Sequence, residues 1–247
     1  MESSPKLIVL TTVYNCQDYI KRCILTIKNQ EYKNFKCYLL NDVSTDNSIE
    51  MAQQAFGDDD RFVIINNTKK RYQAGNYDLI IRDKDLVSDE DIVVEVDGDD
   101  WLPDSKVFNR VVDYYSDGKT WITYGQFIYT SGHPGLSAPV KIASIRESRF
   151  TASHLRTWKV WLWNKIQPED LLVDGQYAEC SGDVFFMMPM LEMAGEQNSK
   201  FINDINYIYN FENPIGDSRG ERLSLTNKFA ELGRGKPRYS KYEKDNS

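Results

Sequence analysis

Several features that mark common protein classes are missing from this chain of 247 residues. None of its fourteen glycines falls in the spacing of a G-x-G-x-x-G turn or a Walker A loop, so phosphate must be bound by other means. The four cysteines form no C-x-x-C pair, which argues against a zinc knuckle. The sequence shows neither a signal peptide nor an apolar run of membrane length. We therefore expect a cytoplasmic protein without a membrane span.

An excess of positive charge is also missing, since the formal net charge is -7 at pH 7. Proteins whose main partner is nucleic acid usually present a basic face, so we expect no nucleic-acid partner, although one nucleotide can still bind locally. Residues 233–247 depart from this trend, because they are rich in Lys and Arg and have no apolar periodicity. We expect them to form a flexible tail, or to lead into a further segment.

Short β-rich apolar runs alternate with helical periodicity in the first half of the chain. Strands spaced by helices predict an α/β domain with a mostly parallel central sheet and helices on both faces. The expected strands are 7–13, 37–40, 62–65, 92–96 and 121–124, and the expected helices are 18–30, 49–56, 72–86 and 104–115.

Polar side chains follow the first four expected strands directly. Ligands of such sheets bind outside the carboxyl ends of the strands, so these residues predict a binding site at one edge of the sheet. They are Thr12, Tyr14 and Asn15, then Asn41 and Asp42, then Asn66 and Asn67, and finally Asp97 to Asp100.

The acidic run Asp97-Gly98-Asp99-Asp100 carries the clearest chemical signal. Three carboxylates within four residues repel one another unless a cation lies between them. Carboxylate oxygens suit Mn²⁺ or Mg²⁺, and either ion can bridge to a diphosphate. A solvated acidic turn is the alternative, but the apolar strand before the run fixes its place. We predict metal ligands at Asp97, Asp99 and Asp100.

Three segments resemble the family 2 inverting glycosyltransferases of the GT-A fold. Residues 9–15 (VLTTVYN) are similar to the opening of that family, 39–48 (LLNDVSTDNS) to its second signature, and 96–103 (VDGDDWLP) to its Asp-x-Asp-Asp, or DXD, motif. Their order and spacing also agree over roughly the first 105 residues.

The resemblance implies one GT-A domain over residues 1–232, with a nucleotide-sugar-binding half at 1–105 and an acceptor-side half at 106–232. It implies a metal-dependent, inverting, hexosyl-type transfer from a nucleoside-diphosphate sugar to an acceptor hydroxyl on a glycan or glycoconjugate. A nucleotidyltransferase, which makes the activated sugar, is a rival enzyme class. It would need a Gly- and Arg-rich phosphate loop, and this sequence has none. A catalytically degenerate module that binds a nucleotide-sugar or a glycan stays open as the alternative.

The resemblance also implies which residues bind the donor. Thr12 and Tyr14 would line the base pocket, and Asp42 would accept a hydrogen bond from the base. Uracil and thymine offer an N3–H for that bond and cytosine does not, so a UDP- or dTDP-sugar is favoured and a GDP-sugar stays open. Asn76 corresponds to the Asn of the family's A-R-N segment. Gly75 replaces its Arg, so Arg71 or the lysines before it could contact the diphosphate, unless they form only a solvated basic turn.

The same resemblance assigns the reacting groups. Asp97 would face the ribose or the metal, Asp99 would be the main metal ligand, and Asp100 would lie beside it. Asp183, in a weaker match to the family's E-D motif, would be the catalytic base, a role compatible with capping a helix. Besides Gly75, three positions depart from the family pattern: Asn41 replaces an Asp, Val43 a Gly and Gly182 a Glu.

The aromatic residues of the second half allow two interpretations. Trp158, Trp161 and Trp163 are expected to pack in the core, or else to form a stacking platform for the acceptor sugar. His154, just before them, could contact the metal or diphosphate, although an ordinary surface or core position is the favoured interpretation.

Overall fold

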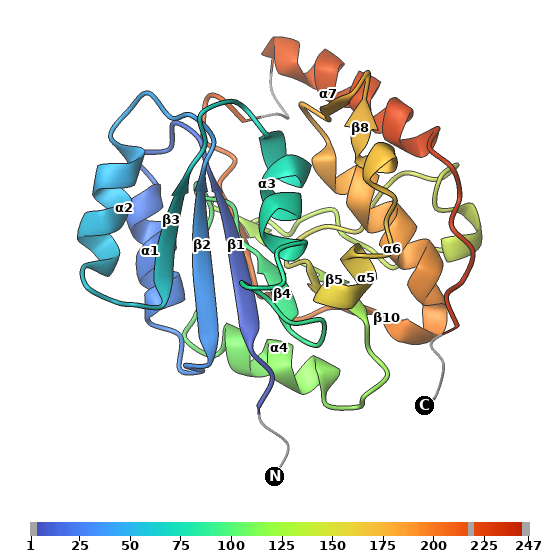
Figure 1. The fold of residues 1–247 in the computed structure, drawn as a ribbon, viewed down its shortest axis with the longest axis horizontal. Helices are drawn as coiled ribbons and strands as arrows, with labels where there is room; N and C mark the ends of the chain where they lie inside the picture. Colours follow the sequence, from blue (N-terminus) through green and yellow to red (C-terminus); the bar gives the residue numbers. More distant parts are fainter. Residues whose placement is uncertain (1–3, 217–219, 244–247) are drawn as a thin grey trace.

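A seven-stranded sheet forms the centre of the computed structural model, which describes residues 4–216 and 220–243 (Figure 1). Its strand order is β10-β5-β7-β4-β1-β2-β3, and all pairings are parallel except those of β7 with β4 and β5. The mostly parallel sheet is therefore confirmed, with one antiparallel strand that the sequence did not predict. The strands are β1 Leu7–Val13, β2 Phe35–Asn41, β3 Phe62–Asn66, β4 Ile92–Glu95, β5 Ile122–Gly125, β7 Thr157–Lys159 and β10 Ser199–Ile202.

Helices cover both faces of this sheet, as predicted (Figure 1). Helices α1, α2 and α4 share a hydrophobic core with one face, and α3, α5 and α6 share a second core with the other. α7 packs on α6. The helices are α1 Ile20–Lys28, α2 Ser48–Phe56, α3 Tyr72–Ile81, α4 Val107–Tyr115, α5 Val160–Trp163, α6 Gly182–Asn198 and α7 Gly220–Arg234.

Short elements complete the second half. β6 Ile128–Tyr129 pairs with β11 Ile208–Tyr209, and β8 Leu172–Val173 pairs with β9 Gln176–Tyr177. Two 3-10 turns lie at Ile142–Ser144 and Pro168–Leu171. Among the residues that the structure describes, no helix is both long and apolar enough to span a bilayer.

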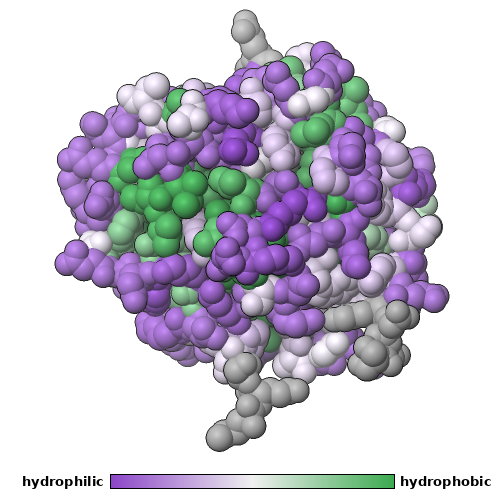
Figure 2. Space-filling model, in the orientation of Figure 1, coloured by the Kyte–Doolittle hydropathy of each residue, from purple (hydrophilic) through white to green (hydrophobic). Residues whose placement is uncertain are grey.

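The α3 face of the sheet is incompletely covered near its β3 edge. Val63 and Ile65 of β3 are only partly buried where they pack against the core on this face. Figure 2 shows a hydrophobic patch beside α3, over the β2–β3 side of the sheet. The helices on this side therefore protect the central strands better than the edge strand.

The three tryptophans lie in the core, so the predicted acceptor platform at these residues is wrong. Trp158 on β7 and Trp163 on α5 are fully buried, and Trp161 is 7% exposed. Trp158 and Trp163 stack with a centroid distance of 5.8 Å and surround Phe186 of α6 together with Tyr77 of α3. A buried ring has no face left for a sugar.

The expected flexible tail is also wrong for residues 233–243, which lie against the domain. The buried guanidinium of Arg146 donates to the carbonyls of residues 233, 234, 236 and 237, and it forms an ion pair with Glu192. Tyr239 donates its hydroxyl to Asp170, and Tyr242 donates its backbone N–H to Met193. Residues 244–247 lie outside the described residues.

Val43, which stands where the family usually has Gly, adopts a left-handed backbone conformation with φ of 63°. Its Cβ crowds the backbone in this region, and a β-branched residue there is unusual. The neighbouring turn holds it in place, because Asn41 Oδ1 accepts the N–H of Ser44 at 3.0 Å and Asp42 N–H donates to Val13 O at 2.9 Å.

We expect Val43→Gly to raise the free energy of unfolding by about 1 kcal/mol. Relief of the left-handed conformation gains about 1–2 kcal/mol, and the greater freedom of glycine in the unfolded chain takes back roughly 0.5–1 kcal/mol. Urea denaturation measures the difference. Val43→Ala keeps a Cβ at the same φ and should show no such gain. A lower midpoint for the glycine variant would show that the valine side chain contributes more than its conformation costs.

Candidate active site

One cleft of about 730 Å³ lies at the carboxyl ends of β1, β2 and β4. Side chains from both halves of the chain line it, and it lies at the edge of the sheet where the sequence predicts a ligand site. The predicted site residues along it are Thr12, Tyr14, Asp42, Asn76, Asp97, Asp99, Asp100 and Asp183.

The acidic turn after β4 is held tightly against β1. Gly98 N–H donates to Thr12 O at 3.0 Å, and a Cβ on Gly98 would lie 2.7 Å from that oxygen. Only glycine permits this approach. Thr12 Oγ1 donates to Asp97 Oδ1 at 3.0 Å, so the side chain at the end of β1 also orients the first carboxylate.

The three carboxylates of the turn have different surroundings. Asp100 is buried, and its oxygens accept the Tyr207 hydroxyl and the Asn210 N–H, each at 2.7 Å. Asp100 therefore anchors a late segment of the chain. Asp97 and Asp99 are half-buried, and Asp99 Oδ2 accepts Asn213 Nδ2 at 2.8 Å. These two carboxylates are the better placed to meet a ligand in the cleft.

Crowded negative charge makes this turn suited to a cation. Burial, and then the charge of Asp99, raise the pKa of Asp97 to about 6. The same two causes raise the pKa of Asp100 well above its usual value. A divalent cation would offset this repulsion, and a set of carboxylate oxygens suits Mn²⁺ or Mg²⁺.

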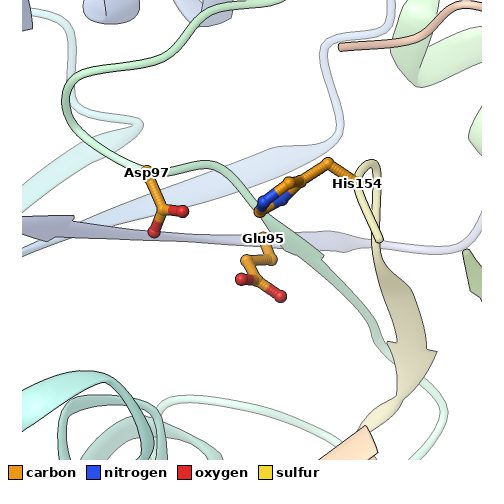
Figure 3. Close-up of side chains that lie close together, drawn as sticks. All are labelled: Glu95, Asp97 and His154. Carbon is orange, nitrogen blue, oxygen red and sulfur yellow. The ribbon is translucent and has the colours of Figure 1, made fainter. Parts of the chain in front are cut away.

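His154 lies beside these carboxylates, on the segment before β7. Ligand atoms of Glu95, Asp97 and His154 lie within 4.8 Å of one another, and Figure 3 shows the three side chains gathered at the end of β4. Burial lowers the pKa of His154, so the ring is neutral, and it stacks on Tyr207 with a centroid distance of 4.4 Å. Its Nδ1 has no hydrogen-bond partner among the described residues. A neutral imidazole next to carboxylates is compatible with a metal site.

Glu95 is the least exposed of these three residues, and neighbouring side chains bind its carboxyl group. Its Oε1 accepts Arg156 Nη1 at 2.8 Å and Gln73 Nε2 at 2.9 Å. Burial raises the pKa of Glu95 to about 8. Because Glu95 is buried and already bound by Arg156 and Gln73, Asp97 and Asp99 remain the better candidates for metal ligands.

Asp42 fixes the turn that precedes α3. Its carboxylate accepts the N–H groups of Arg71 and Tyr72 at 2.8 and 3.1 Å, and Asn67 Nδ2 at 3.2 Å. A carboxylate has about four acceptor positions, and these three hydrogen bonds do not fill all of them. Asn76 is buried, donates to Tyr72 O at 2.7 Å and accepts Asn67 Nδ2 at 2.6 Å, which stabilises the same turn.

Lys70, rather than Arg71, is the cation of this turn that lines the cleft. Its Nζ lies 2.8 Å from the centroid of the Tyr14 ring and 3.8 Å from Asp42 Oδ2. Tyr14 is 43% exposed, so an aromatic ring and an ammonium group stand together at the end of β1. The side chain of Arg71 is not among the cleft-lining residues, and the sequence had no means to choose between these adjacent cations.

Asp183 lies in the first turn of α6 and reaches the same cleft. Its Oδ1 accepts the Val184 N–H at 3.0 Å, and its Oδ2 forms an ion pair with Arg156 Nη2. The side chain is 21% exposed. Arg156, which bridges Asp183 and Glu95, is a site residue that sequence reasoning missed. No motif marks it, since its partners are far away in the sequence.

Comparison with known proteins identifies the family and fold of this chain. The family model described as glycosyl transferase family 2 matches residues 8–188. This match covers most of the chain, so the chain belongs to that family. Its fold is the GT-A fold, as predicted, because the structures that it resembles are GT-A glycosyltransferases.

The individual relatives have low sequence identity to this chain or match only part of it. S. aureus TarS in complex with UDP-GlcNAc superimposes with a TM-score of 0.65 at 14% identity, over 89% of this chain and 60% of that chain. Glucosyl-3-phosphoglycerate synthase from Mycobacterium tuberculosis, in complex with Mn²⁺, UDP-glucose and phosphoglyceric acid, gives 0.62 at 12% identity, over 96% and 82%. Glycosyltransferase GlyA of Streptococcus pneumoniae is 30% identical over 125 residues, which are 45% of this chain and only 16% of that protein.

Proposed function

We propose that this chain catalyses the metal-dependent, inverting transfer of a sugar from a nucleoside-diphosphate sugar to an acceptor hydroxyl of a glycan or glycoconjugate. The observation that carries the proposal is that Asp97 and Asp99 share one cleft with Asp183, although more than eighty residues separate them. Family membership and the nucleotide-sugar complexes of TarS and the mycobacterial synthase support the donor class.

Each group in the cleft has a place in this proposal. Tyr14, Lys70 and Asp42 would bind the base and the adjacent phosphate. Asp97 and Asp99 would hold Mn²⁺ or Mg²⁺, which stabilises the negative charge of the leaving diphosphate. Asp183 would accept the proton of the acceptor hydroxyl as this oxygen attacks the anomeric carbon from the face opposite the leaving group. Arg156 would orient the carboxylate of Asp183 from behind.

The structure also bears on the catalytically degenerate alternative. Asn41, which replaces an Asp of the family, still supplies the oxygen that accepts Ser44 N–H in this turn. Gly182, which replaces a Glu, lies against α3, where an added Cβ would be 3.1 Å from Gln73 Oε1. Neither departure removes Asp97, Asp99 or Asp183 from the cleft, so we favour the enzyme. A reducing, cytoplasmic compartment remains part of this proposal, and the four cysteines are free thiols.

A panel of donors tests the proposal. Thermal unfolding is followed with UDP-, dTDP-, GDP- and CMP-sugars, each with and without Mn²⁺. The matching donor with Mn²⁺ should add about 2.7 kcal/mol of stability at a hundred times its dissociation constant. We expect UDP- or dTDP-sugars to give the largest effect, because Asp42 can accept an N3–H. Tighter binding of the CMP-sugar would contradict this role. Binding of a donor without any transfer or hydrolysis would favour the degenerate alternative.

A further inference from the structure

Four aromatic rings form a continuous cluster along one wall of the cleft. They are Phe127, Tyr129, Tyr209 and Phe211, and all four line the cleft. The ring centroids of Tyr129 lie 5.2 Å from Phe127, 5.8 Å from Tyr209 and 5.7 Å from Phe211. The sequence did not single out this cluster, because its members come from two segments some eighty residues apart.

The exposure of these rings increases from the core toward the cleft. Phe127 is 6% exposed, Tyr129 and Tyr209 are half-buried, and Phe211 is 42% exposed. Tyr129, Tyr209 and Phe211 therefore present partly exposed ring surface to the cleft, which a ligand could cover. The cluster therefore resembles a binding surface more than a part of the core.

The cluster stands on a rigid support that is tied to the acidic turn. β6 and β11 pair with each other, and Ile208 of β11 exchanges two backbone hydrogen bonds with Trp101. The segment before and after β11 is bound to Asp100 through the Tyr207 hydroxyl and the Asn210 N–H. The rings are thus held at a fixed place next to the acidic turn whose carboxylates would hold the metal.

We propose that Tyr129, Tyr209 and Phe211 form the platform that binds the acceptor, and that the acceptor is a saccharide whose pyranose ring presents a flat C–H face. This inference rests on the proposed function. One face of such a ring is apolar while its hydroxyls point outward, so an aromatic surface can cover the face and leave the hydroxyls to polar partners. The two tyrosine hydroxyls can bond to the sugar rim.

In the proposed arrangement, the nucleotide base occupies a different part of the cleft and does not compete for this platform. Tyr14 follows β1, and Lys70 lies in the turn before α3. Together they form the surface assigned to the nucleotide base. The platform comes from β6 and β11 instead, in the half of the chain where the sequence resemblance places the acceptor. The tryptophans that the sequence offered for this role are buried, and these rings take their place.

Saturation-transfer NMR with simple glycosides tests the platform. The probes are methyl β-D-glucopyranoside, methyl β-D-galactopyranoside and methyl N-acetyl-β-D-glucosaminide, each added to the protein with UDP and Mn²⁺. At least one should bind, with saturation concentrated on the C–H protons of one ring face. Phe211→Ala should weaken that binding by about tenfold, since an aromatic contact is worth up to about 1.5 kcal/mol. Tyr129→Leu, which keeps apolar volume, serves as the second variant.

Leu136→Ala is the matched control, because Leu136 is 60% exposed and does not line the cleft. It should leave both glycoside and UDP binding unchanged. UDP affinity, measured by calorimetry, should also stay unchanged in the two platform variants. Glycoside binding that is equal in all four proteins, or absent from the wild type while UDP binds, would overturn the platform. Failure of the wild type to bind UDP with Mn²⁺ would instead count against the proposed function itself.

Discussion

Replacing Asp99 by alanine is expected to abolish the Mn²⁺-dependent part of nucleotide-sugar binding and to leave the fold intact. Asp99 is half-buried at the cleft, and its charge raises the pKa of both Asp97 and Asp100. Without it the turn loses a carboxylate ligand and much of its attraction for a cation. Outer-shell partners of metals typically contribute about 10–100-fold in affinity, so loss of a direct ligand should cost at least about a hundredfold. Calorimetry with UDP, at fixed Mn²⁺ and with EDTA, measures this.

Two further variants separate charge from structure. Asp99→Asn retains an oxygen that can accept the hydrogen bond from Asn213 but removes the negative charge. It should lose Mn²⁺ binding nearly as completely as the alanine variant. Because it also relieves repulsion within the turn, the metal-free protein should be at least as stable as the wild type. Asp58→Ala, at an exposed position that does not line the cleft, should bind normally. Unchanged UDP binding in Mn²⁺ by Asp99→Asn would refute the metal assignment.

The strands in the first half of the fold could be predicted because each is an apolar run that ends at polar residues. Apolar runs such as 7–13 and 92–96 stop at polar residues, and parallel strands bring their carboxyl ends to one edge of the sheet. The cleft residues Thr12, Asp42 and Asp97 follow from that rule alone. Helix ends were less certain: the helix expected over 72–86 ends at Ile81.

The second half could not be predicted in the same way, because its residues contact others that are far away in the sequence and its elements are short. β7 has only three residues, too few for a period of two to show, yet it lies between β4 and β5. Arg156 is a lone cation in sequence, and its partners Glu95 and Asp183 are 61 and 27 residues away. The segment from Gly233 onward is held partly through its backbone carbonyls, on which side-chain periodicity carries no information.

Asp183→Asn should lower the turnover number by about a hundredfold or more, while donor binding stays nearly unchanged. Inverting transfer is a single displacement, so it needs a base that accepts the acceptor proton and is not occupied by the metal. Asp183 meets this condition, because among the described residues its carboxylate binds Arg156 and the Val184 N–H, and it lies in the cleft at the start of α6. The asparagine keeps the volume and an oxygen for Arg156, but it cannot act as a base. General base catalysis typically contributes about 10²–10⁴ in rate.

Glu179 provides the matched control for this variant, since it is the other half-buried carboxylate of the same segment that lines the cleft. Glu179→Gln should change turnover by less than about threefold if Asp183 is the base. Steady-state kinetics of both variants, with calorimetric affinities for UDP in Mn²⁺, separates loss of basicity from loss of the donor site. Near-normal turnover in Asp183→Asn together with a large loss in Glu179→Gln would move the base to Glu179. Arg156 would then serve to bind buried Glu95 and to hold the start of α6 through Asp183, rather than to orient a catalytic group.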